Sequence, residues 1–150
     1  MRKRVITTKL AVIPPTPIEI PEIKYPLPRL AIETRTPEEQ EWVATLIEGE
    51  GSFFIKRHRY DEITPETYKH EYLYPGFSMK MHEKPHMEVA SKLLVFTLYE
   101  YPPAFMVYVE GAKAVAMANW AIPYLVPHGH RFTEALRILE TFREHPTIKS

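Results

Sequence analysis

Apolar and polar positions along the chain follow two periods, one typical of helices and one of strands. After Thr36, a proline occupies the first helical position and Glu39 follows two residues later. A threonine N-cap with an acid three residues on is a capping box, which starts a helix. Apolar residues then recur at helical spacing as far as Gly49 and Gly51, so the pattern predicts a helix between Thr36 and these glycines.

Two stretches after this helix alternate with a period of two, which is typical of half-buried strands. They cover 52–60 and 72–83, and a polar loop over 61–71 separates them. In the second stretch one side carries Phe77, Met79 and Met81, and the other carries Gly76, Ser78, Lys80 and His82. We therefore predict two strands with one buried side each.

The rest of the chain predicts a helix, a hairpin and two further helices. The first of these helices begins near Pro85, and its inward positions are Met87, Val89, Ala90, Leu93 and Leu94. The hairpin strands and the last two helices span 97–101, 105–110, 113–122 and 132–144. The order is helix, strand, strand, helix, strand, strand, helix, helix, which indicates an α+β protein.

Residues 1–35 form a proline-rich, basic arm that differs from the body over 36–150. Six prolines between positions 11 and 30 disfavour helix, and apolar residues among them favour an ordered arm. The arm has seven basic and three acidic residues, whereas the body has twelve basic and sixteen acidic ones. The arm could help to bind a polyanion, or it could be a solvated tail.

Composition excludes some classes of protein. The chain has no cysteine, which excludes disulfides, thiolate zinc sites and cysteine nucleophiles. No apolar run approaches the ~20 residues of a membrane span, so we expect a cytoplasmic protein without a membrane partner. Fifteen prolines with one asparagine and one glutamine suggest a thermophilic source.

The residues from Trp42 to Phe53 read WVATLIEGEGSF, which resembles the LAGLIDADG signature of homing endonucleases. The order of elements also resembles that family's αββαββα unit, followed here by an extra C-terminal helix. The resemblance covers roughly residues 36–125. It implies a curved antiparallel sheet that forms a saddle on DNA, and a metal-dependent enzyme that makes double-strand cuts at a long site.

By this resemblance, Glu50 is the catalytic acid and binds Mg²⁺, or Mn²⁺, together with the carbonyl oxygen of Gly49. Oxygen ligands suit such hard cations, and the metal would activate water for attack on a phosphodiester. Glu83 and Lys113 are further catalytic candidates. The alternatives are that Glu83 is an acid favoured by a helix dipole and that Lys113 is an exposed helix lysine. We interpret Glu48 as structural.

One signature per chain implies a homodimer in which two copies of the first helix pack together and each brings one carboxylate. We expect Val43, Ala44 and Ile47 at this dimer interface. Small residues such as Ala44 and Gly49 allow close approach, whereas Thr45 departs from the family's glycine and must be accommodated. A twofold dimer implies a palindromic or near-palindromic target.

The polar side of the sheet would face the major groove, which admits β-ribbons. The candidate DNA-binding residues are Phe54, Lys56, His58, Ser78, Lys80, His82 and Tyr108. Lysine can donate to guanine, and serine and tyrosine can donate to bases or phosphates. The histidines of the 128–131 turn are interpreted as surface residues.

Two functions are consistent with these residues. The first is an intron-encoded or free-standing endonuclease that acts on double-stranded DNA. The alternative is a nucleic-acid-binding relative that does not cleave, either an RNA maturase or a DNA-binding regulator. The zero net charge and the small number of cationic strand residues keep the alternative open.

Overall fold

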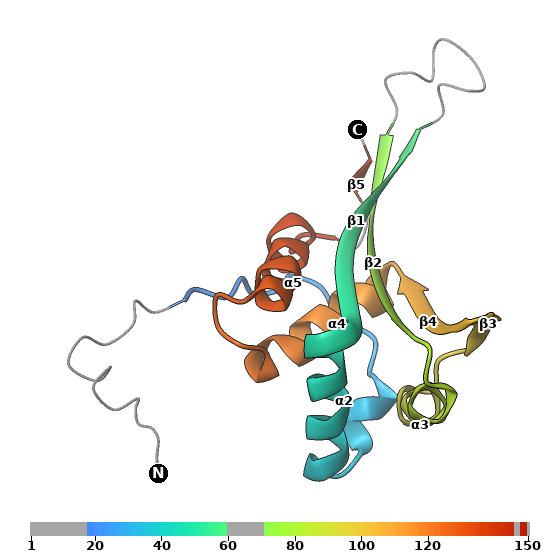
Figure 1. Cartoon of the computed structure of the whole chain (residues 1–150). Coiled ribbons are helices and arrows are strands. Elements are labelled where there is room, and N and C mark those ends of the chain that lie inside the picture. Colours follow the sequence, from blue (N-terminus) through green and yellow to red (C-terminus); the bar gives the residue numbers. More distant parts are fainter. Residues whose placement is uncertain (1–17, 60–70, 146–147, 150) are drawn as a thin grey trace.

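The computed structural model describes residues 18–59, 71–145 and 148–149 of the chain (Figure 1). The elements are η1 (Ala31–Thr34), α2 (Pro37–Glu50), β1 (Gly51–Arg59), β2 (Glu71–Met81), α3 (Lys84–Leu94), β3 (Tyr99–Tyr101), β4 (Ala104–Glu110), α4 (Ala112–Ala121), η3 (Ile122–Tyr124), α5 (His130–Thr141) and β5 (Ile148–Lys149). The predicted order of helices and strands is confirmed, including the extra C-terminal helix. The predicted loop lies outside the described residues, apart from Glu71, which begins β2.

The strands form one antiparallel sheet in the order β1-β2-β4-β3 (Figure 1). Phe53 of β1 lies opposite Phe77 of β2, and Met79 of β2 lies opposite Val107 of β4. All four of these side chains are buried, so they mark the inward side of the sheet. The short β5 pairs with β2 and was not predicted.

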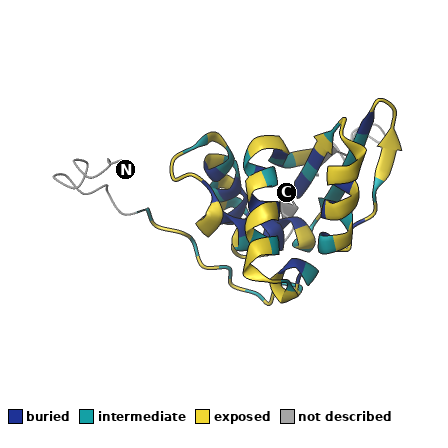
Figure 2. Cartoon of the chain, turned by 60° about the horizontal axis from the view of Figure 1, so that its bottom comes forward, coloured by how far each residue is buried: buried dark blue, intermediate teal, exposed yellow. Residues whose placement is uncertain are grey.

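The core lies between this inward side and the helices, as Figure 2 shows by the buried positions on their facing sides. In α4 the buried residues include four alanines, Ala114, Ala116, Ala118 and Ala121, which let the helix lie close to its neighbours. In α3 Met87, Ala90 and Leu94 are buried, as predicted. Val89 is 46% exposed, which corrects its predicted inward position, because it lies on the outer side of the helix.

The predicted capping box of α2 is confirmed. The Thr36 hydroxyl accepts a hydrogen bond from the Glu39 amide at 3.1 Å, and the Glu39 carboxylate accepts one from the Thr36 amide at 3.0 Å. Gln40, one turn later, connects α2 to two other elements. Its side-chain oxygen accepts from Trp120 Nε1 and from the Tyr124 hydroxyl, at 3.0 and 3.2 Å. These bonds fix the position of α2 on the body.

The described part of the N-terminal arm packs on the body. The Lys24 amide donates to the Arg143 carbonyl and the Tyr25 hydroxyl donates to the Phe142 carbonyl, both at 2.7 Å. Burial raises the pKa of Tyr25 to about 12, so this hydroxyl keeps its proton at ordinary pH. Leu30 and Ile32 belong to the core. None of the helices in the described residues is long and apolar enough to cross a membrane.

Gly76 lies beneath the Phe54 ring on the outward side of the sheet. A Cβ atom added to Gly76 would come within 2.3 Å of Phe54 Cε1, whereas a Cβ on the helical Gly49 would meet nothing within 4 Å. We expect Gly76→Ala to lower the free energy of unfolding by about 1–3 kcal/mol, because the ring must move. Gly49→Ala, the matched control, should raise it by about 0.5–1 kcal/mol because alanine favours helix. Urea denaturation measures both changes, and equal effects would contradict this packing.

Candidate functional site

The end of α2 brings the candidate metal ligands to the surface. Glu50 is the last residue of α2, and both it and Gly49 are exposed. The last carbonyl groups of a helix lack partners within the helix and carry partial negative charge. The Glu50 carboxylate and the neighbouring Gly49 carbonyl therefore present oxygen atoms where a cation is favoured electrostatically.

Glu48 differs from Glu50 in its contacts. Its carboxylate accepts a hydrogen bond from the Val126 amide at 2.9 Å, so it connects α2 to the segment that follows η3. This contact confirms the interpretation of Glu48 as structural. Among the described residues Glu50 makes no side-chain hydrogen bond or ion pair, so its carboxylate is available to an external ligand.

The structure does not join the other two catalytic candidates to Glu50. Glu83 is the N-cap residue of α3, and its carboxylate pairs with His86 Nδ1 at 3.2 Å. Lys113 is an exposed residue in the first turn of α4, two residues after Gly111, whose amide donates to the Pro75 carbonyl.

The exposed position of Lys113 in the first turn of α4 fits the alternative interpretation, an exposed helix lysine, and separates it from Glu50 within one chain. Glu50 directly precedes Gly51, which pairs with Met79, four residues along β2 from Pro75. Four residues of a strand span roughly 13 Å. This distance is too long for a lysine side chain in the first turn of α4 to cross.

No group of three or more histidines, cysteines or acids in the described part of the chain could hold a metal ion. One protomer therefore offers a single free carboxylate and a carbonyl at the end of α2. Mg²⁺ binds through one or two carboxylates with water and substrate phosphates as its other ligands, so this donor set fits Mg²⁺ in type. A complete ligand set would need the substrate or a second copy of the chain.

The predicted dimer-interface residues are buried within the protomer. Val43 and Ile47 have 0% of their surface exposed and Ala44 has 3%, so the first two cannot contact a partner. This corrects the assignment of Val43 and Ile47, which pack into the core of the protomer, whereas Ala44 borders the exposed side of α2 and stays a predicted interface residue. The exposed side of α2 instead carries Glu38, Glu41, Trp42, Thr45 and Gly49, which recur at helical spacing.

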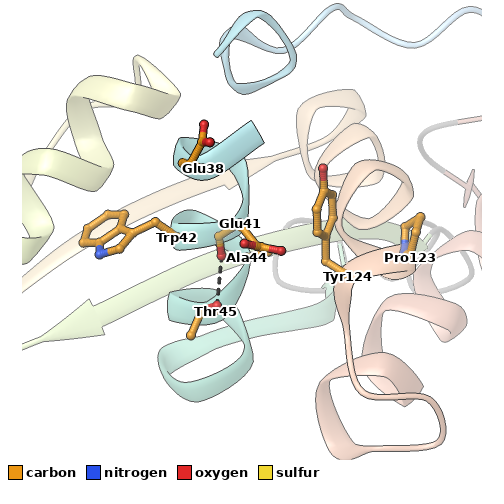
Figure 3. A pocket seen from close by; sticks show the side chains of 7 residues that line it. All are labelled: Glu38, Glu41, Trp42, Ala44, Thr45, Pro123 and Tyr124. Atoms are coloured by element: carbon orange, nitrogen blue, oxygen red, sulfur yellow. Dashed lines mark hydrogen bonds between the residues drawn. The ribbon is translucent and has the colours of Figure 1, made fainter. Parts of the chain in front are cut away.

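An open hollow of about 710 Å³ borders this exposed side of α2 (Figure 3). Its lining residues are Glu38, Glu41, Trp42, Ala44, Thr45, Pro123 and Tyr124. Figure 3 shows Trp42 and Tyr124 on opposite sides of the helix, and the Thr45 hydroxyl donates to the Glu41 carbonyl at 2.9 Å. Trp42 is 36% exposed and meets the His86 ring edge-on, with 6.2 Å between ring centroids. The helix thus presents a large aromatic side chain and a short polar one to solvent.

The outward side of the sheet brings together most of the predicted DNA-binding residues. Strand pairing places Ser78 opposite Tyr108, Lys80 opposite Met106, and Phe54 opposite Gly76. Lys56 lies on the same side of β1, two residues after Phe54. Lys80 is exposed, and exposed His82 follows the end of β2. The side chain of His58 lies outside the described residues.

Three residues of this surface form a polar cluster. Lys56 Nζ is 3.1 Å from a Glu110 carboxylate oxygen, and the Tyr108 hydroxyl donates to the same oxygen. Pairing with Glu110 raises the pKa of Lys56. Partial burial and the same carboxylate raise the pKa of Tyr108. The Phe54 ring lies beside the Tyr108 ring, with 5.8 Å between centroids, so Phe54 is a packing platform in the free protein.

Sequence reasoning missed Glu110, Tyr99 and Tyr101 on this outward side. Strand β3 places Tyr99 opposite Met106, and Tyr99 and Tyr101 are 40% and 57% exposed with their rings stacked. Continuing the alternation of β4 by two residues beyond Tyr108 would have found Glu110. The two tyrosines required the register of β3 on β4, which the sequence does not reveal.

The sequence matches no protein-family model and no curated protein. The fold, however, is similar to solved structures of homing endonucleases. Two crystal structures of the homing endonuclease I-CvuI match with TM-scores of 0.51 and 0.50, at 13% and 16% identity. One is a complex with an I-CreI target in the presence of magnesium, with the DNA not cleaved, and the other is a complex with its own target in the presence of calcium.

Each match covers 67% of this chain and 64% of the I-CvuI chain. At this identity the likeness shows the fold. The chain therefore has the α+β fold of the LAGLIDADG homing endonucleases, and the resemblance seen in the sequence is confirmed at the level of the fold.

The different contacts of Glu48 and Glu50 predict different effects on stability. Glu48→Ala removes the acceptor of the Val126 amide and should lower the free energy of unfolding by about 0.5–1.5 kcal/mol. Glu50→Ala removes an exposed carboxylate that has no partner among the described residues and should leave stability unchanged. Chemical denaturation of the two variants measures this difference. A loss for Glu50→Ala as large as that for Glu48→Ala would show that Glu50 has a structural role.

Proposed function

We propose that this protein is a site-specific homing endonuclease that cuts both strands of a long duplex site. In this proposal the chain acts as a homodimer and requires Mg²⁺ or Mn²⁺. The observation that carries the proposal is the free, exposed carboxylate of Glu50 beside an open helix end, at the junction between α2 and the sheet. The endonuclease fold of the I-CvuI structures supports it.

Glu50 and the Gly49 carbonyl would hold the metal, which supplies an activated water and charge stabilisation at the phosphodiester. The chain's own residues position the DNA. Lys80 directly follows Met79, which pairs with Gly51 at the junction of α2 and β1, so it can neutralise a phosphate near this junction. The outward side of the sheet fixes the register of the duplex through its polar side chains, so that one phosphodiester lies beside Glu50.

The homodimer follows from the number of carboxylates. A double-strand cut needs a hydrolytic site for each strand, and each chain supplies one free acid at its α2 end. The exposed side of α2, with Trp42 and Thr45, is the surface that a second copy would cover. Packing of two such helices along their length would bring both Glu50 side chains to the base of the interface.

The alternative is a nucleic-acid-binding relative without nuclease activity, such as an RNA maturase or a DNA-binding regulator. Two observations favour it. Glu110 neutralises Lys56 on the DNA-facing side, and the whole chain has a net charge of zero. In a protein that binds without cutting, substitution of Glu50 would not change what happens to the bound nucleic acid.

Cleavage is tested on a duplex that spans the insertion site of the protein's own gene, joined without the insertion, in the presence of Mg²⁺. We expect the wild-type protein to cut both strands. Glu50→Gln should lower the cutting rate by roughly a hundredfold or more while binding persists, because the metal loses its charged ligand. Glu140→Gln, at an exposed position of α5, is the control with the same change of charge. Undiminished cutting by Glu50→Gln would refute the assignment, and wild-type binding without cutting would favour the alternative.

The dimer is tested by sedimentation of the purified protein over a range of concentrations. Thr45→Arg adds a large charged side chain to the exposed side of α2 and should weaken association at least tenfold, which corresponds to about 1.4 kcal/mol. Glu88→Arg, at an exposed position of α3, should have no effect on association. If the wild-type protein sediments as a monomer both without and with DNA, the proposed homodimer is contradicted.

A further inference from the structure

Glu110 is an acid on the outward side of the sheet, the side that would face the phosphates of DNA in the proposed function. Among the described outward positions of β1, β2 and β4, Glu110 is the single acid. It pairs with Lys56 and accepts the Tyr108 hydroxyl. The Lys56 and Glu110 side chains are 53% and 35% exposed, and exposed ion pairs contribute only about 0–1 kcal/mol to stability. Fold stability therefore gives little reason for an acid at this position.

The pair forms across an intervening strand. Lys56 is on β1 and Glu110 is on β4, so β2 lies between them and their backbones are roughly 10 Å apart. Gly76 of β2 lies opposite both Phe54 and Glu110, and it has no side chain to fill the space. The Phe54 ring lies over Gly76 and beside the Tyr108 ring. The sheet thus holds the side chains of Lys56 and Glu110 together beside the rings of Phe54 and Tyr108.

Two charges held 3.1 Å apart present a cation and an anion side by side to a bound duplex. In the major groove, a C·G pair displays the N4 amino donor of cytosine beside the O6 and N7 acceptors of guanine. A carboxylate accepts from the first, and a lysine donates to the second. A phosphate, in contrast, repels the carboxylate and must compete with it for the lysine.

We propose that the Lys56–Glu110 pair is a specificity determinant that reads a C·G base pair and suppresses binding through phosphates alone. This inference rests on the proposed function, because it assumes that the outward side of the sheet contacts duplex DNA. In the free protein Glu110 withholds Lys56 from phosphates. In the specific complex Glu110 accepts from cytosine N4, and Lys56 donates to guanine on the same base pair.

The first test measures affinity for a non-specific alternating A·T duplex across about 50 to 200 mM salt. Glu110→Gln frees Lys56 for phosphates, so non-specific binding should tighten and the slope of log K against log salt should steepen by about 0.9 per protomer. Glu140→Gln is the control with the same change of net charge on the helical layer. In a Lys56→Met background, the effect of Glu110→Gln on the slope should disappear, because the acid acts through the lysine.

The second test selects bound duplexes from a randomised pool and compares base preferences. The wild-type protein should enrich C·G at one position in each half-site, and Glu110→Gln should lose that enrichment while the other positions keep theirs. If Glu110→Gln matches Glu140→Gln in salt slope and in selected sequence, the inference is overturned and DNA binding itself stands. If the wild-type protein binds no duplex in either test, the proposed function fails and the inference fails with it.

Discussion

Gly51 is the residue at which α2 ends and β1 begins, without any connecting loop. Its amide donates to the Ile47 carbonyl and closes the helix, and its backbone is extended, as a strand requires. A Cβ at this position would come within 2.8 Å of the Ile47 carbonyl oxygen, so only glycine fits without a shift of the backbone. No loop separates α2 from β1, so neither element can shift without the other. The packing of their buried sides on the core therefore determines the orientation of Glu50 at the end of the helix. The position of the candidate metal ligand therefore depends on a steric constraint at the next residue.

The same junction connects the two surfaces on which the proposed activity depends. On one side of it, α2 exposes Trp42 and Thr45, and on the other, β1 carries Phe54 and Lys56 on the outward side of the sheet. Helix α2 has five glutamates and no basic residue, and its C-terminal end is the negative end of the helix dipole. Two such ends brought together would repel each other unless a cation lay between them. In the proposed homodimer, a divalent metal near the paired helix ends would offset this repulsion.

Much of the fold could be predicted because local signals agreed with each other. The capping box at Thr36 and the alternation that ends at Met81 are short-range patterns, and the structure confirms both. The outward positions of Ser78 and Lys80 followed from the same alternation. The failures concern which side of a helix faces inward and which residues meet in space. Val43 and Ile47 are apolar, and apolar side chains are common both in the core of a protomer and in a dimer interface. The sequence alone therefore could not show that these two residues lie in the core.

The contacts of individual site residues were also beyond local pattern. The positions of Lys113 relative to Glu50, and of Lys56 relative to Glu110, depend on the register of β2 with both of its neighbours. No residue in the sequence specifies that register by itself. The role of Glu48, in contrast, was correctly interpreted, because an acid just before the end of a helix often bonds to an adjacent segment and here meets the Val126 amide.

The central claim is that two copies of Glu50 meet at the base of paired α2 helices. The chain has no cysteine, so a single Glu50→Cys substitution provides one unique site for a spin label in each protomer. Pulsed electron paramagnetic resonance of the labelled protein on duplex DNA would then give the distance between the two positions. We expect a single short distance, near the lower limit of the method, and a much longer one for a label placed by Tyr101→Cys at the edge of the sheet. A long or absent distance at position 50, in a protein that still binds DNA, would contradict it.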